Sequence, residues 1–445
     1  MSNRIVITAA ALAITIATHA QPSAWTLENC IKQAIANNID LKQRIQELEQ
    51  RDIEKNTAQN SWLPAINAGI GQNFDFGRSP SKDGVILDRT SANTSASLQL
   101  NMPLFDGFRT PNDIAARKLN LAAASESLAK AKDDLAVGVA SYYLQALYNK
   151  EILAIAELQK TLVASQVAKT EALVNAGKVP LSQLYDIKAQ AAKDEVTLTD
   201  ARNNVKLALL NLAQLLELER TGADFDIITP ELKADMPDNT SITPPEAIYE
   251  SALIIKPQIK EQDLLLESRK KSLKVAQSAY YPQLNLNMSY SNGYYHYSGT
   301  DVLNVNFGDQ LKQNERKTIG MSLNIPIFNR YQTRNNVRSA RAAIITQELL
   351  AENAKKTLYK EIQQAYFNAA SAREKHASAA RSVEAAKEAF SYAEERYATG
   401  KSTVFEYNES KTKYAQSLSE QAQAKFDYIF RKKILDFYGG IPFSL

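Results

Sequence analysis

Four segments of the chain alternate apolar and polar residues, a pattern typical of β-strands with two different faces. In the first of them, Ile66 and Ile70 alternate with Asn67 and Gly69. The polar positions of all four are mostly Asn, Ser, Gln or Gly, whereas a soluble sheet usually carries Lys and Glu there. Uncharged polar faces on strands of about ten residues favour a membrane β-barrel, with a soluble sandwich as the alternative. The predicted strands are residues 65–76, 91–104, 283–292 and 318–327.

Four strands are too few to close a barrel, and an open sheet edge cannot face lipid. We therefore expect several copies of the chain to share one barrel. Three copies would supply about 12 strands, an even number within the usual range for outer-membrane barrels.

The longest predicted helices repeat apolar residues every seven positions. Residues 112–176 contain no proline and a single glycine, and Leu121, Leu128 and Leu135 recur at heptad spacing. This indicates an uninterrupted coiled-coil helix of ~97 Å, because each residue adds about 1.5 Å. The other predicted helices are return helix 181–219, a second long helix 330–398 with return helix 403–437, and shorter helices at 27–37, 40–61 and 257–280.

The two halves of the chain are copies of one unit. Glu28 to Pro64 aligns with Glu246 to Pro282 at a constant offset of 218 residues, and from Leu98 to about residue 186 the offset is 223. The five-residue difference falls in the hairpin between the strands, so the long helix keeps a fixed length in both copies. We predict a first repeat over 21–222, an irregular equatorial segment over 223–244 and a second repeat over 245–445.

The chain begins with an export signal rather than with a structural element. Residues 1–20 combine a basic start at Arg4, an apolar stretch and a small-x-small ending at Ala20. This is typical of a cleaved signal peptide, which predicts a protein that folds outside the cytoplasm.

Composition gives no support for an enzyme. The chain has 52 basic and 49 acidic residues spread along its length, so no nucleic-acid partner is expected. Its three histidines, His19, His296 and His376, are far apart in sequence, and there is one cysteine, Cys30. We therefore expect no catalytic site, no metal site and no cofactor.

Several paired motifs resemble the TolC family of outer-membrane efflux proteins. They are Trp25 to Glu28, Trp62-Leu63-Pro64 with Tyr281-Pro282, the Asn-x-Pro-(Leu/Ile)-Phe signatures at 101 and 324, and the turns Ala176-Gly177-Lys178 and Thr399-Gly400-Lys401. The resemblance covers nearly all of the mature chain. It implies an internally duplicated α+β membrane protein, in which each protomer gives four strands to a shared trimeric β-barrel and long antiparallel helices to a coiled-coil barrel.

The resemblance also implies a location and partners. The chain would be a homotrimer in the outer membrane of a Gram-negative bacterium, in contact with lipid and extending into the periplasm. It would conduct substrates passively, supplied by an inner-membrane pump and a periplasmic adaptor in an efflux or type I secretion system. Two non-channel alternatives stay open, namely a periplasmic coiled-coil adaptor and a structural protein.

In this family the two helical turns form the closed periplasmic tip. The resemblance makes the turn residues candidate adaptor contacts: Gly177, Lys178, Pro180, Gly400, Lys401 and Thr403. It also implies a ring of acidic residues just past the turns, and the matching positions are Gln183, Asp186, Glu406 and Glu409. The family often has Asp at these positions and Gln183 is uncharged, so an alternative reading of the three acids is solvated carboxylates on a helix face.

Overall fold

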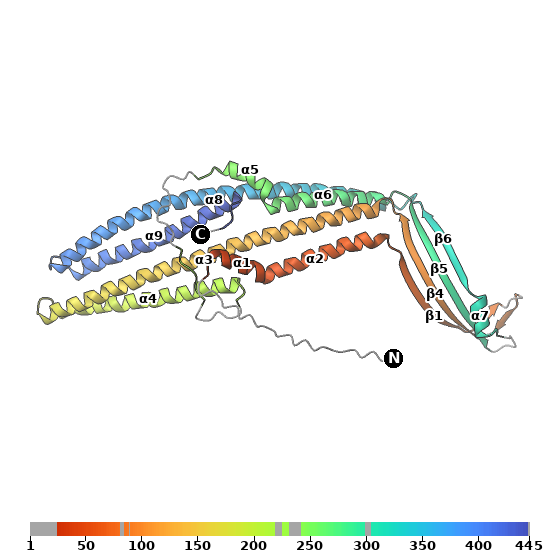
Figure 1. Cartoon of the computed structure of the whole chain (residues 1–445), viewed down its shortest axis with the longest axis horizontal. Helices are drawn as coiled ribbons and strands as arrows, with labels where there is room; N and C mark the ends of the chain where they lie inside the picture. The colour runs from red at the N-terminus through yellow and green to blue at the C-terminus, as the bar shows by residue number, and fades with distance from the viewer. Residues whose placement is uncertain are drawn as a thin grey trace, which may run out of the picture.

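The computed structural model describes residues 25–80, 84–88, 90–218, 225–230, 242–298 and 304–443. Long helices run side by side over most of the molecule, and a sheet lies at one end (Figure 1). The predicted signal peptide and part of the predicted equatorial segment lie outside the described residues.

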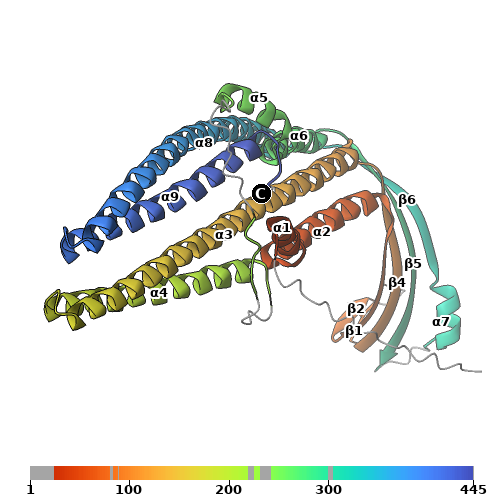
Figure 2. The same ribbon diagram turned by 60° about the vertical axis from the view of Figure 1, so that its left-hand side comes forward.

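Four strands form one antiparallel sheet in the order β1-β4-β5-β6, and the strands bend along their length (Figure 2). Ala65 pairs with Asn101, Asn101 also pairs with Asn287, and Gln283 pairs with Asn324. Strands β1 and β6 are therefore the two open edges of the sheet. The strand bounds are β1 Ala65–Asp75, β4 Thr90–Phe105, β5 Gln283–Ser298 and β6 Arg316–Asn324, with the small pair β2 Arg78–Pro80 and β3 Ile86–Asp88 beyond them.

Strand β5 is longer than the sequence predicted. The run from Tyr294 to Tyr297, which includes His296, follows the predicted strand end at residue 292 and lies within β5. The strand continues because β4 pairs with it as far as Ser298. The predicted end at residue 292 was therefore wrong.

The other edge of this extension of β5 is covered by side chains. The unpredicted short helix α7, Phe307–Gln313, lies beside it. Gln310 accepts a hydrogen bond from the Tyr295 backbone N–H and donates one to the Tyr295 carbonyl, both at 2.8 Å. Asn304 makes the same two contacts with Tyr297 at 2.9 Å. These side-chain amides form hydrogen bonds with the backbone of β5 in the part of the strand that β6 does not reach.

Two helices of 67 residues each, α3 (Arg109–Asn175) and α8 (Gln332–Ala398), run the length of the helical part. At about 1.5 Å per residue each is about 100 Å long. Beside them, half-length helices occupy either the tip half or the sheet half (Figure 1). These are α4 Leu181–Leu215 and α9 Val404–Tyr438 at the tip, α2 Ile39–Gln59 and α6 Pro257–Ser278 near the sheet, and α1 Leu27–Asn37 and α5 Pro245–Ile255 between them.

The backbone repeats the duplication seen in the sequence. Helix α8 begins and ends 223 residues after α3, and α9 does so after α4. Left-handed backbone recurs at the same offset even where the residue type differs: Glu217 has φ 52° and Gly440 has φ 95°. The other such pairs are Gly107 with Arg330, Phe108 with Tyr331, and Gly177 with Gly400.

The principal apolar core lies midway along the helices, where α1 packs against α3. The Tyr143 ring on α3 is 1% exposed and Cys30 on α1 is fully buried. The Tyr143 hydroxyl lies 3.0 Å from the Trp25 carbonyl oxygen and 2.7 Å from that of Ile228. Trp25 and Ile227 also form a parallel bridge. This core therefore attaches the first described residues, and a piece of the predicted equatorial segment, to the long helix.

Candidate functional site

The two helical turns at the far end from the sheet are built alike. Gly177 follows α3 with φ 67°, and Gly400 follows α8 with φ 72°, a conformation that favours glycine. The Lys178 N–H donates to the Leu173 carbonyl at 2.9 Å, and the Lys401 N–H donates to the Arg396 carbonyl at 2.8 Å. Each long helix therefore ends in a Schellman motif, which fixes the direction of the returning helix.

The return helices start at Pro180 and Thr403. Pro180 precedes α4 in extended backbone, and the Thr403 hydroxyl caps α9 by accepting from the Glu406 N–H at 3.2 Å. All six tip residues predicted as adaptor contacts are exposed, and they lie in the turns that connect α3 to α4 and α8 to α9.

The four gate candidates lie on the first two turns of α4 and α9. Glu406 accepts from the Ser402 hydroxyl at 2.7 Å and is 3.6 Å from the Arg396 guanidinium, so its carboxylate is held at its own turn. Glu409 pairs with Lys413 on the solvent side of α9 at 2.7 Å. Asp186 is exposed and Gln183 is half-buried. Within one chain, no described hydrogen bond or ion pair joins any two of these four residues.

The most buried ion pair near the tip involves two residues that the sequence analysis did not single out. Lys411 on α9 pairs with Asp194 on α4, and the two side chains are 3% and 6% exposed. Gln190 donates a second hydrogen bond to the Asp194 carboxylate at 2.6 Å. The pair joins the two hairpins, which come from different copies of the repeat.

A sequence signal for this pair existed. Asp194 falls on the buried row of α4 between Ile187 and Leu198, and Lys411 falls on the buried row of α9 between Tyr407 and Ala415. A charged residue in a heptad core row is rare unless it is paired. Heptad spacing alone does not show which two of the interrupted apolar rows face each other in the fold.

Aromatic packing joins the hairpins closer to the turns. Val163 and Ile187 from the first hairpin pack in one cluster with Tyr397 and Tyr407 from the second. The Tyr397 hydroxyl lies 3.4 Å from the Thr170 hydroxyl, and both residues are buried. The two hairpins of one chain are therefore joined by an apolar cluster as well as by the ion pair.

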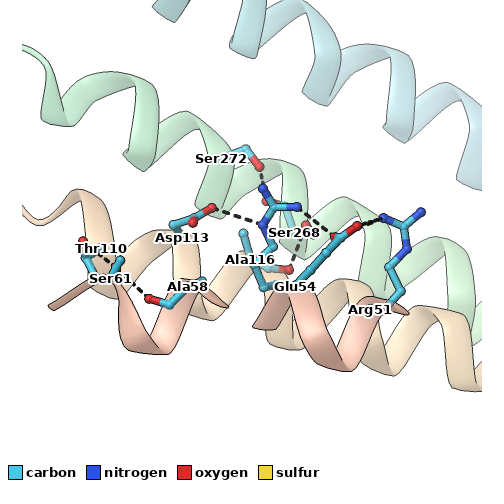
Figure 3. Close-up of polar contacts among 10 residues, drawn as sticks. Arg51, Glu54, Ala58, Ser61, Thr110, Asp113, Ala116, Ser268 and Ser272 are labelled. Carbon is cyan, nitrogen blue, oxygen red and sulfur yellow. Dashed lines mark hydrogen bonds and ion pairs between the residues drawn. The ribbon is translucent and has the colours of Figure 1, made fainter. Parts of the chain in front are cut away.

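A seam of polar contacts joins the helices directly below the sheet (Figure 3). Ser268 on α6 is 3% exposed and donates to the Ala116 carbonyl of α3 at 3.3 Å. The next residue of α3, Arg117, lies 3.0 Å from Glu54 of α2 and 3.4 Å from Asp113 of its own helix. Helix α3 is therefore flanked by α2 and α6, which are equivalent helices of the two copies.

One face of the sheet exposes apolar side chains in the isolated chain. Ile70 on β1 is 84% exposed, and Ile319 and Met321 on β6 are 75% and 70% exposed. The opposite face carries Asn73 and Ser322, among others. A row of bare apolar side chains along a sheet marks a surface that meets lipid or another protein.

None of the helices in the described residues is both long and apolar enough to cross a membrane. Across the described ranges, no group of three or more His, Cys, Asp or Glu residues is arranged to hold a metal ion.

Comparison with known proteins begins with a family model. The model described as "Outer membrane efflux protein" matches residues 30–217 and 248–431, which are most of the two repeats. Among curated proteins, the chain is 24% identical over 338 residues to the outer membrane efflux protein BepC of Brucella suis, covering 76% of this chain and 68% of the relative. It is 23% identical to the outer membrane protein TolC of Escherichia coli, covering 92% of this chain and 81% of the relative.

Solved structures share the fold over nearly the whole chain. A crystal structure of CusC, whose description refers to transmembrane channel formation, matches with a TM-score of 0.76 at 16% identity and covers 95% of both chains. The outer membrane protein VceC of Vibrio cholerae matches with a TM-score of 0.74 at 15% identity, covering 94% of this chain and 97% of that one. These likenesses confirm the predicted fold class of long barrel-forming helices with a small set of barrel strands.

Proposed function

The chain belongs to the outer membrane efflux protein family, and from that premise we propose that three copies form one continuous duct across the outer membrane and the periplasm. The observation that carries this proposal is the sheet with two open edges, β1 and β6, and one bare apolar face. Three such sheets would pair edge to edge into a barrel that hides every edge and turns Ile70 and Met321 to lipid.

The helices support the same arrangement below the membrane. In the described residues, α2, α3, α6 and α8 lie across the sheet half of a protomer, and α3, α4, α8 and α9 lie across the tip half. With three protomers these would form a wall about 100 Å long, the length of α3. The duct would then reach deep into the periplasm, and the predicted leader, residues 1–20, would direct the export that this location requires.

We propose that the exposed tip is where a periplasmic adaptor docks, so that an inner-membrane pump can load the duct. The turn residues suit this role because they are exposed and held in a fixed backbone conformation. Conduction through the duct itself would be passive, with the energy for transport supplied by the pump.

Three copies of Glu406 and Glu409 around one axis would form an acidic constriction that favours cations. Asp186 and the uncharged Gln183 would occupy the equivalent positions of the first copy. The carboxylates of Glu406 and Glu409 lie beside Arg396 and Lys413, so their positive neighbours would moderate the charge of the ring.

The proposal is tested by purifying the full-length mature chain in detergent and reconstituting it in a planar lipid bilayer. We expect a particle with the mass of three chains that conducts ions. A stable monomer that inserts nowhere would refute the shared duct. A trimer that stays in the aqueous fraction without detergent would favour a periplasmic coiled-coil protein instead.

A further inference from the structure

We infer that β6 of one subunit pairs antiparallel with β1 of the partner subunit in one register, in which Gly320 lies opposite the partner subunit's Asn73. This inference rests on the proposed three-chain barrel and goes further, because it assigns residue partners across a junction that a single chain does not contain.

Strand register is the same in the two copies of the repeat. Each strand of the first copy corresponds to one of the second: β1 to β5 at an offset of 218, and β4 to β6 at an offset of 223. In the first copy Ala65 lies opposite Asn101. Moving each residue by the offset of its own strand gives Gln283 opposite Asn324, which is the observed pair. The duplication therefore preserves strand register as well as strand position.

The same rule applies to the junction between the copies. Inside the chain, β4 pairs with β5, and Asn101 lies opposite Asn287. The equivalent of β4 is β6, and the equivalent of β5 is β1, which lies at the far edge of the same sheet and is thus available only from another chain. Moving both residues by their offsets places Asn324 opposite the partner subunit's Gly69. Following the strands outward, Gly320 lies opposite the partner subunit's Asn73, and Thr318 opposite the partner subunit's Asp75.

The two faces of the sheet agree with this register. Residues that lie opposite one another in a sheet point to the same face, and a slip of one residue would exchange the faces. In the inferred register, Ile319 lies opposite the partner subunit's Phe74 and Leu323 opposite the partner subunit's Ile70, so apolar side chains meet apolar side chains. Ser322 lies opposite the partner subunit's Gly71, and both are on the polar face.

Charge favours the same alignment at the outer end of the junction. Arg316 and the partner subunit's Asp75 are on the same face and two residues apart along the strands. Such diagonal neighbours lie about 7–8 Å apart at their Cα atoms, within reach of an arginine. Among the described residues of its own chain, the Asp75 carboxylate has only a long contact, to the Ser91 hydroxyl at 3.5 Å. The guanidinium of the neighbouring subunit is a stronger partner for it.

The helices supply an independent check on the order of the subunits. Within the chain α3 packs against α6 through Ser268 and Ala116, and the equivalents of α3 and α6 are α8 and α2. In the described residues α2 packs against α3 alone among the long helices, and its other side is open. The seam in Figure 3 would therefore recur between α8 and the α2 helix of the neighbouring chain, with Ser339 near the partner subunit's Gln50.

Cysteine cross-linking of the full-length chain tests the register. In a Cys30→Ala background, Asn73→Cys with Gly320→Cys is the matched pair, and an added Cβ at Gly320 meets no atom within 4 Å. Directly opposite residues have Cα atoms about 4.5–5.5 Å apart, within the range of a disulfide. The shifted controls combine Asn73→Cys with Thr318→Cys or with Ser322→Cys. No bond can form within one chain, because β1 and β6 are separated by two strands and lie roughly 14 Å apart.

Under mild oxidation in membranes we expect the matched pair to give a covalent three-chain species, at least roughly fivefold faster than either shifted pair. Gln72→Cys with Met321→Cys is a second matched pair on the other face, for use if the first variant fails to assemble. The mass of the particle before oxidation is measured in the same samples. An intact trimer that cross-links faster in a shifted pair, or in no pair, overturns the register alone. Absence of a trimer overturns the proposed duct and this inference together.

Discussion

The Lys411 ammonium lies 2.5 Å from the Asp194 carboxylate, and both groups are almost fully removed from solvent. The contact bridges α9 and α4, so it is one of the few direct links between the return helices of the two hairpins. A buried pair of this kind adds little to stability compared with well-packed apolar residues, but breaking it leaves one charge uncompensated. Its position near the tip makes it a determinant of how firmly the hairpins stay together.

Lys411→Met should therefore loosen the tip. The buried Asp194 carboxylate would keep only its bond from Gln190, at a cost of about 3–5 kcal/mol. Hydrogen exchange of the amides in α4 and α9 measures this local opening. Lys413→Met is the matched control on the same helix, because its partner Glu409 is exposed and the pair contributes at most about 1 kcal/mol. The double variant Asp194→Leu/Lys411→Met should recover most of the protection against exchange. Equal exchange in Lys411→Met and Lys413→Met would contradict the role given to the buried pair.

Two neighbouring residues of β4 test which face of the sheet meets lipid. Leu100→Arg should block or strongly slow membrane assembly, because arginine on the lipid face costs about 2–4 kcal/mol near the bilayer centre. Gln99→Arg, one residue earlier on the polar face, should assemble normally. The readout is the amount of detergent-extracted trimer in outer membranes. The reverse result would exchange the two faces.

Neutralising Glu409 tests the acidic constriction. If three copies of Glu409 line the pore, Glu409→Gln should reduce the ratio of cation to anion permeability by at least about twofold. The fall in this permeability ratio is larger because the Lys413 ammonium then no longer has the Glu409 carboxylate beside it. Reversal potentials in a salt gradient measure the ratio, and Glu420→Gln further along α9 serves as the control. An unchanged reversal potential would leave Glu409 as an ordinary helix-face carboxylate.

Removing one hydroxyl should weaken the middle of the molecule. Tyr143→Phe takes away the contacts to the Trp25 and Ile228 carbonyls, at a cost of about 1–2 kcal/mol. Amides of residues 25–28 and 225–230 should then exchange roughly 5–30 times faster. Tyr366→Phe, at the equivalent position of the second copy, should leave that exchange unchanged. If both variants behave alike, the hydroxyl of Tyr143 is not what holds this segment.

Cys30 should be unreactive until the protein unfolds. Burial raises the pKa of its thiol from 9.0 to about 12, so it stays protonated where an ordinary cysteine ionises. A maleimide should label it only in denaturant, with little increase between pH 7 and 9. The unfolded chain loses this proton at a lower pH than the folded chain does. The thiol therefore makes stability fall as pH rises from about 9 to about 12. Rapid labelling of the native protein would show that the core around α1 opens.

Local sequence pattern was enough for much of this fold, and its limits can be traced to particular contacts. Alternation located the hairpins because each strand has one apolar and one polar face. It missed the outer end of β5, where β4 pairs along one edge and the side chains of Gln310 and Asn304, rather than a strand, bind Tyr295 and Tyr297 along the other. Such side-chain partners depend on the path of the loop, which has no period to detect.

The candidate site was also partly recognisable from local sequence pattern and partly dependent on the fold. Turn glycines at 177 and 400 were recognisable because only a left-handed residue closes that motif. Asp194 and Lys411 interrupt two regular apolar rows, yet the pairing of those rows is set by how the two hairpins pack. The long-range pair therefore required the fold, whereas each of its members stood out locally.

The connection between β4 and α3 is three residues long and is tightly packed at Gly107, which is buried. Gly107 lies so close to the end of α6 that an added Cβ would come within 2.5 Å of the Ser278 carbonyl oxygen, and its left-handed backbone recurs at Arg330. Gly107 therefore leaves little room for a hinge between this strand and this helix. We therefore expect any widening of the tip to come from bending along the helices rather than from movement at this junction.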